Sequence, residues 1–257
     1  MSSARVNPLV SIVTVVFNGK EFLERTILSV IRQDYTDIEY IVIDGASSDG
    51  TLGIIRQYEK NITYWVSEKD RGIYDAMNKG IKASNGDYLW FLNAGDEIYG
   101  PDTVRKIVSG RGSPDVYYGE TMLVDASGNE LGTRSEMSRN KLPETLSWKD
   151  MARGMVVCHQ SFIVKRSIVP FYDLSYPHTS DIDWVIKCLK KAHDIVNTRL
   201  VLSRYLVGGY SKKNHLKAMV DRYAVYKKHF GFIANIINHA VIIKDLLGRK
   251  LTGKSSY

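Results

Sequence analysis

The hydrophobic positions in the first hundred residues follow two alternating periods. Four short, nearly continuous apolar runs rich in β-branched and aromatic residues predict strands: 9–18, 38–45, 62–68 and 87–93. Three intervening segments carry apolar residues at helical spacing and predict helices: 21–33, 51–60 and 73–84. Strands this apolar, separated by helices, predict an α/β fold with a mostly parallel sheet flanked by helices.

Polar residues stand where the predicted strands end. Asn18, Asp44 and Asp96 each come at or just after an apolar run, and Asp70 follows the third run closely. In open α/β sheets, ligands bind beyond the carboxyl ends of the strands, where the loops converge. We therefore expect these four side chains to lie around one ligand site.

Two common nucleotide-binding motifs are absent from this edge. The segment GASSDGT at 45–51 has the glycine spacing of a phosphate loop, but Thr51 stands where that loop requires lysine. No G-x-G-x-x-G follows the first strand. The remaining interpretation is a site built on carboxylates, which suits a diphosphate carried by Mg²⁺ or Mn²⁺. Asp96, on a turn that Gly95 makes tight, is the predicted metal ligand, whereas Glu97 is expected to be structural or solvated.

Composition sets the limits of this picture. A chain of 257 residues that is 44% hydrophobic can bury a sizeable core. Cys158 and Cys188 are the only cysteines and form no C-x-x-C pair, so neither a disulfide framework nor a zinc site is expected, as in a reducing compartment. The N-terminal sequence lacks the apolar stretch of a signal peptide, and no run of about 18 apolar residues predicts a membrane span. A cytoplasmic protein is expected.

Charge divides the chain into an acidic body and a basic tail. Residues 187–257 contain 15 Lys and Arg against 3 acids, a net charge of +12, whereas residues 1–186 contain 20 against 25, a net charge of −5. We expect a first domain at 1–211 and a basic amphipathic helical tail at 212–257. No nucleic-acid-binding module accompanies the basic residues, and the acidic body argues against a nucleic-acid partner.

The tail has an apolar helical face flanked by basic residues. This face is formed by Ile233, Ile236, Ile237, Ala240 and Val241, and the flanking cations are Lys227, Lys228, Lys244, Arg249 and Lys250. A basic amphipathic helix lies on anionic membranes, which predicts a peripheral protein on the inner face of the plasma membrane. Two alternatives stay open: helices that close the core, or a contact in a homodimer.

Several segments, in order, resemble the family-2 glycosyltransferases of the nucleotide-sugar-binding A-type fold. They are VSIVTVVFNG, VIDGASSDGT, KDRGIYDAMNKGI, FLNAGDE, CHQSFIVKR and SDIDWVIKCL, and they span roughly residues 8–211. The resemblance implies transfer of a sugar from a nucleoside diphosphate, expected to be UDP, to an acceptor hydroxyl with inversion at the anomeric carbon. Bacterial members often extend polyprenyl-diphosphate-linked glycans during polysaccharide biosynthesis, which implies a lipid-linked acceptor. The alternative is a non-catalytic nucleotide-sugar-binding or scaffold protein at the membrane.

The resemblance also implies roles for individual residues near the donor. Phe17 would stack on the uracil, Asn18 would shape the turn beside it, and Asp96 would hold the metal; the other implied nucleotide contacts are Asp44, Ser47, Arg71, Asn93 and Ala94. Simpler roles are open for some of them. Phe17 suits a core position, Asp44 and Ser47 suit caps of the helix near Thr51, and Arg71 suits a solvated pair with Asp70. The chain departs from the family where Gly45 replaces a frequent second Asp, and where the metal motif, residues 93–96, carries a single acid.

The acceptor side has its own candidates. An acceptor hydroxyl needs a general base, and Asp181 and Asp183 open a predicted helix that turns Ile182, Val185, Ile186 and Leu189 inward. The resemblance favours Asp181 as the base, and one of the two acids is expected only to cap the helix. His159 and Gln160 are implied on the acceptor side, although a buried structural histidine is equally open. Ser211 and Lys212, in a glycine-rich loop, are candidate phosphate contacts.

Overall fold

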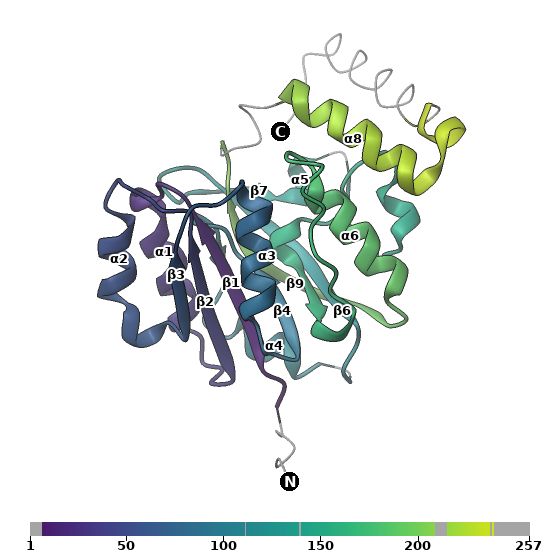
Figure 1. Cartoon of the computed structure of the whole chain (residues 1–257). Helices are drawn as coiled ribbons and strands as arrows, with labels where there is room; N and C mark the ends of the chain where they lie inside the picture. The colour runs from purple at the N-terminus through teal and green to yellow at the C-terminus, as the bar shows by residue number, and fades with distance from the viewer. Residues whose placement is uncertain (1–6, 111, 139, 209–214, 237, 239–257) are drawn as a thin grey trace.

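The computed structural model describes residues 7–110, 112–138, 140–208, 215–236 and 238. Within these residues, nine strands form one sheet in the order β3-β2-β1-β4-β8-β6-β9-β5, with β7 paired to β6 (Figure 1). The strands are β1 (Val10–Val16), β2 (Ile38–Asp44), β3 (Tyr64–Ser67), β4 (Tyr88–Phe91), β5 (Glu97–Ile98), β6 (Val116–Val124), β7 (Glu130–Thr133), β8 (Phe162–Lys165) and β9 (Ile195–Leu206). The helices are α1 (Lys20–Ile31), α2 (Thr51–Gln57), α3 (Ile73–Ala83), α4 (Thr103–Val108), α5 (Arg134–Met137), α6 (Ser180–Lys191) and α8 (His215–Phe230).

The first half of the sheet is parallel, as the sequence predicts. β1 pairs in parallel with both β2 and β4, and β2 pairs in parallel with β3. Side chains of β1 alternate between the two faces: Val13 and Val15 join the core beneath α3 and α6, whereas Ile12 and Val16 join the core beneath α1 and α4. Because both faces are covered, the strands are apolar throughout. The predicted α/β fold is therefore confirmed.

The second half of the sheet is mixed. β8 pairs antiparallel with β4 and β6, whereas β6 and β9 are parallel. β5 then adds to β9 in the antiparallel sense. The expected parallel arrangement is therefore confirmed for β3-β2-β1-β4, whereas the strands beyond β4 form both parallel and antiparallel pairs. This half matters for function because it brings β9 next to the polar segment after β4.

α8 packs across α6 and contributes to the core (Figure 1). Val225 and Tyr226 are fully buried, and Phe230 stacks on Trp148 with ring centroids 5.4 Å apart. α8 therefore packs on the core, which is one of the alternatives left open for the basic tail. Ile237, Ala240 and Val241 of the predicted apolar face lie outside the described residues. Among the helices that the structure describes, none is both long and apolar enough to cross a bilayer.

Candidate functional site

The loops that follow β1 and β2 are tied together by hydrogen bonds. The Asn18 amide donates to Ser47 Oγ at 2.7 Å, and the Ser48 amide donates to Asn18 Oδ1 at 3.0 Å. Asn18 has a positive φ of 49°, which asparagine tolerates better than most residues. Beside this turn, Phe17 is 67% exposed, so it is not a core residue. The two loops thus form a fixed platform that presents an aromatic ring to solvent.

Asp44 organises the loop from inside. Its carboxylate is fully buried and accepts hydrogen bonds from the Ser47 amide at 3.0 Å, from Ser47 Oγ at 2.5 Å and from Ser67 Oγ at 2.6 Å. Neither Asp44 nor Ser47 caps α2, because the residue preceding that helix is Gly50. The capping alternative is therefore wrong, and Asp44 joins the ends of β2 and β3 instead.

Asp70 and Phe17 meet at Gly45. A Cβ atom on Gly45 would lie 2.9 Å from Asp70 Oδ2 and 3.3 Å from Phe17 Cδ2, so the absence of a side chain permits this approach. Asp70 forms an ion pair with Lys79 of α3, and burial raises the pKa of Asp70. Arg71 has no pair with Asp70. Its side chain is 79% exposed and bonds Asp75 at 3.0 Å.

The segment after β4 makes the tight turn that the sequence predicts. Gly95 has a φ of +105°, and the Asp96 amide donates to the Asn93 carbonyl at 2.9 Å. Asp96 is only 4% exposed; Oδ2 accepts from Gln160 Nε2 at 2.8 Å and Oδ1 accepts from the Leu206 amide at 3.3 Å. Burial raises the pKa of Asp96 to about 7, although these hydrogen bonds oppose the shift. The carboxylate is costly to ionise without a cation nearby.

The donor atoms at this turn suit a hard divalent cation. Asn93 Oδ1 is shielded from solvent and has no hydrogen-bond partner among the described residues, so an oxygen ligand close to Asp96 in sequence is available. The same part of the chain has no cluster of three or more His, Cys, Asp or Glu suited to a metal ion. Mg²⁺ sites at nucleotides often use one or two protein oxygens and complete their coordination with phosphates and water. Asp96 and Asn93 fit that pattern.

Side-chain contacts, together with the peptide bond between His159 and Gln160, connect Asp96 to Asp181. Next to Gln160, His159 is 6% exposed and its Nε2 lies 2.6 Å from the Tyr172 hydroxyl. Tyr172 stacks on Tyr74 at 5.5 Å, and the Tyr74 hydroxyl donates to Asp181 Oδ1 at 3.0 Å. Burial lowers the pKa of His159 to about 4, so the ring is neutral at pH 7. His159 therefore reaches the site through Tyr172.

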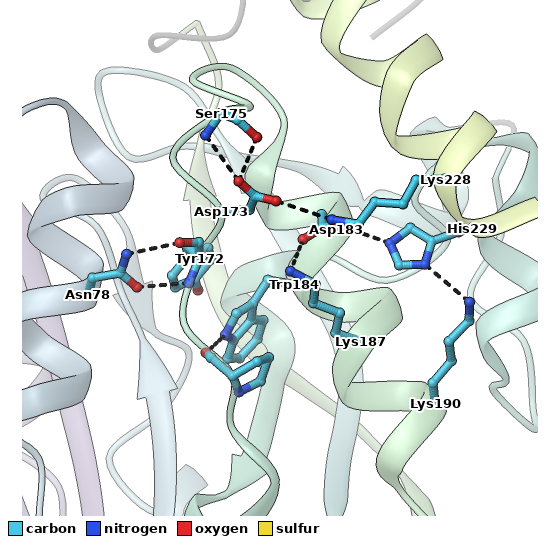
Figure 2. A network of polar contacts seen from close by, with 11 residues as sticks. Asn78, Tyr172, Asp173, Ser175, Asp183, Trp184, Lys187, Lys190, Lys228 and His229 are labelled. Carbon is cyan, nitrogen blue, oxygen red and sulfur yellow. Dashed lines mark hydrogen bonds and ion pairs between the residues drawn. The ribbon is translucent and has the colours of Figure 1, made fainter.

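The two acids of α6 differ sharply in environment. Burial raises the pKa of Asp181, against a smaller opposing effect of the Tyr74 hydroxyl. Asp183 has a fully buried side chain that contacts Lys187 Nζ at 2.5 Å, Lys228 Nζ at 3.0 Å and His229 Nε2 at 2.8 Å (Figure 2). Burial acts to raise the pKa of Asp183, but these three hydrogen-bonded partners outweigh it and hold the pKa far below its usual range. Asp183 therefore connects α6 to α8, and Asp181 faces the Tyr74 side.

Comparison with known proteins identifies the family. The sequence profile described as Glycosyl transferase family 2 matches residues 11–170, more than half of the chain. The chain belongs to this glycosyltransferase family. It is 32% identical over 245 residues to an uncharacterised glycosyltransferase of Mycobacterium tuberculosis, covering 91% of this chain and 90% of that protein. It is 25% identical over 229 residues to the putative teichuronic acid biosynthesis glycosyltransferase TuaG of Bacillus subtilis, covering 86% and 88%.

Solved structures of similar fold place this glycosyltransferase in the A-type class. S. aureus TarS 1–349 in complex with UDP-GlcNAc superposes with a TM-score of 0.65 at 16% identity, covering 84% of this chain and 65% of that one. The mannosyltransferase PcManGT of Pyrobaculum calidifontis, in complex with GDP-Man and Mn²⁺, gives 0.61 at 16% identity, covering 98% and 77%. This chain therefore spans just under two-thirds of the TarS fragment.

The sequence did not indicate several residues that the structure places at this candidate site. Tyr74 and Tyr172 connect His159 to Asp181, and Ser67 completes the bonds of Asp44. Tyr74 lies within a segment that resembles the family, which was the available signal. Tyr172 and Ser67 carry no comparable motif. The candidate phosphate contacts Ser211 and Lys212 lie outside the described residues.

Proposed function

We propose that the protein is an inverting glycosyltransferase that moves a sugar from a UDP-sugar to a hydroxyl of a glycan acceptor in cell-surface polysaccharide synthesis. The observation that carries the proposal is the connection from Asp96, a carboxylate suited to a metal ion, through the neighbouring residues Gln160 and His159 to Asp181, a partly buried carboxylate with a raised pKa. The complexes named for TarS and the biosynthetic role named for TuaG support the donor and the pathway.

The donor nucleotide occupies the platform after β1 and β2. Phe17 stacks on the uracil, since a large ring exposed to this extent at a polar edge offers a base-stacking surface. Asn18, Asp44 and Ser47 act mainly by holding the two loops in place. Arg71 is exposed and, within the described residues, pairs with Asp75 as its one charged partner, so it can exchange that bond for a phosphate.

The diphosphate lies over the turn after β4. Asn93 and Ala94 belong to this turn and contact the nucleotide. Asp96 and Asn93 would hold Mn²⁺ or Mg²⁺. When bound, the cation supplies charge neutralisation for the departing diphosphate. Gln160 holds Asp96 in place through its amide at 2.8 Å. The carboxylate therefore needs little rearrangement when the donor arrives.

Asp181 is the general base of a single displacement. A base works best when its pKa approaches the operating pH, and burial moves Asp181 in that direction. The Tyr74 hydroxyl donates to Asp181 Oδ1 and orients the carboxylate toward the acceptor. His159 positions this pair through Tyr172. Asp183 is a poor base, because its hydrogen bonds with Lys187, Lys228 and His229 hold its pKa far below the usual range.

The acceptor is lipid-linked and the enzyme is peripheral on the inner face of the plasma membrane. Among the described residues, five of the nine exposed large hydrophobic side chains fall between positions 219 and 236: Met219, Val220, Phe232, Ile233 and Ile236. Exposed Lys217 and Lys227 accompany them. An apolar patch with basic neighbours binds anionic membranes.

We place the end of the catalytic domain after α8 rather than at residue 211, because Val225 and Tyr226 belong to its core.

A hydrolysis screen tests the enzymatic proposal. Release of the nucleoside diphosphate is measured from a panel of UDP-sugars with Mn²⁺, and GDP-mannose is the unrelated donor. We expect slow release from one or a few UDP-sugars, abolished in Asp181→Asn. Release from GDP-mannose alone would contradict the UDP assignment.

Sedimentation with anionic vesicles tests the membrane proposal separately. The double variant Phe232→Ser, Ile233→Ser should no longer sediment with the vesicles.

A further inference from the structure

Polar contacts fix α8 against α6 and the segment before it at two places, the middle and the C-terminal end of α8. Towards its C-terminus, Lys228 and His229 contact Asp183 of α6, as Figure 2 shows. Near its middle, Asp221 Oδ2 accepts a hydrogen bond from the His178 amide at 3.0 Å, two residues before α6 begins. The position of α8 relative to Asp181 is therefore set by polar contacts at both places.

Arg222 lies on the face of α8 that meets α6. It precedes Val225 and Tyr226 by three and four positions and His229 by seven, and these spacings place all four on one helical face. Val225 and Tyr226 are fully buried there and His229 contacts Asp183. The charge of Arg222 acts on the Asp181 carboxyl. Burial raises the pKa of Asp181, and Arg222 partly offsets that rise.

The Arg222 side chain has a donor without an acceptor. Its Nε atom is shielded from solvent and forms no hydrogen bond within the part of the chain that the structure describes. A buried unsatisfied donor costs about 1–3 kcal/mol, more for a charged group. Arg204 Nε has the same property, but the Arg204 side chain has an ion pair with Glu130 at 2.9 Å. No ion pair is formed by Arg222 within the described residues.

We propose that Arg222 binds a phosphate group of the substrate beside Asp181, so that α8 completes the site. The planar guanidinium suits bidentate phosphate binding. Two sources share this chemistry: the diphosphate of the nucleotide donor, and the diphosphate of a lipid-linked acceptor. The inference rests on the proposed function, and it gives α8 a role in the active site in addition to membrane docking.

Calorimetry with four probes tests this assignment in full-length protein with Mn²⁺: UDP, uridine, inorganic pyrophosphate and geranyl diphosphate. The variants are Arg222→Gln, Arg222→Lys and the matched control Lys227→Gln, which removes a charge from the exposed face of α8. A hydrogen bond to a charged group contributes about 1.5–3 kcal/mol, so Arg222→Gln should weaken diphosphate binding roughly 10- to 150-fold. Lys should restore part of the affinity, and uridine binding should not change.

The probes distinguish the source of the phosphate. Weaker binding of UDP assigns Arg222 to the donor, whereas weaker binding of geranyl diphosphate with unchanged UDP affinity assigns it to the acceptor. Equal affinities of wild type and Arg222→Gln for every diphosphate would overturn the inference while leaving the UDP site intact. A wild type that binds no UDP but binds geranyl diphosphate through Arg222 would contradict the donor assignment alone. A wild type that binds no diphosphate at all would overturn both. A thermal unfolding midpoint within about 2 °C of wild type shows that the variant is folded.

Discussion

The two acids of α6 should respond in opposite ways to the same substitution. Asp183 is fully buried and contacts Lys187, Lys228 and His229. Removing one partner of a buried ion pair costs about 3–5 kcal/mol. Because the Lys187 and Lys228 side chains are 28% and 38% exposed, solvent screens part of the interaction, and we expect about 3 kcal/mol for Asp183→Asn. In a domain of this size that loss lowers the unfolding midpoint by about 6–12 °C.

Asp181→Asn should leave stability unchanged or slightly increase it. The pKa of Asp181 is raised in the fold, so its stabilising effect is present only below the unfolded pKa and becomes a penalty as pH rises. The pKa of Asp183 is lowered, so its contribution is present above the unfolded pKa and is lost as pH falls. At pH 7 the neutral asparagine therefore removes a cost at Asp181 and a benefit at Asp183.

Urea unfolding at pH 7, monitored by circular dichroism, measures both effects alongside UDP release from the donor. Asp173→Asn is the matched control, because Asp173 also bonds Lys228 at 3.1 Å but has a 32% exposed side chain, and its loss should cost less than about 1 kcal/mol. We expect Asp181→Asn to be stable and inactive, and Asp183→Asn to be destabilised with residual activity. A stable, inactive Asp183→Asn together with an active Asp181→Asn would refute the assignment.

Three further outcomes are expected. Phe17→Ala should weaken UDP binding about tenfold by calorimetry and leave the unfolding midpoint unchanged, since the ring is 67% exposed; unchanged affinity would exclude stacking. Gly45→Ala should weaken UDP binding, because its Cβ would lie 2.9 Å from Asp70 Oδ2, whereas Gly53→Ala, with nothing within 4 Å, should be harmless; equal affinities would show that the loop adapts. The free energy of unfolding should fall by on the order of 3 kcal/mol between pH 6.5 and about 4, since the pKa of His159 is lowered to about 4, and His159→Gln should lack that slope; an identical slope in the variant would assign the effect elsewhere.

The elements of the first half of the sheet follow from local sequence patterns. Continuous apolar runs and helical spacing depend on residues close together in the chain, and they predicted β1, β2, β3 and β4 with the helices between them. The same reasoning placed Asn18, Asp44 and Asp96 at one sheet edge, because parallel strands share an edge at their carboxyl ends.

The second half of the sheet and the details of the site depend on contacts distant in sequence. β8 pairs antiparallel with β4, and no local pattern specifies that choice. Asp183 and His229 are 46 positions apart, so the role of Asp183 as a link to α8 appears only in the folded chain. The basic residues of α8 likewise indicated a surface tail, although Lys228 and His229 bind a buried carboxylate.

Titration of UDP into the protein with and without Mn²⁺ tests the central claim, that the turn after β4 holds the metal and the diphosphate. The wild type should bind UDP with Mn²⁺ and bind it much more weakly without the ion. Asp96→Asn should remove the dependence on Mn²⁺, because Asp96 supplies the charged ligand, whereas Asp181→Asn should bind UDP as the wild type does. Unchanged Mn²⁺-dependent UDP affinity in Asp96→Asn would contradict the account.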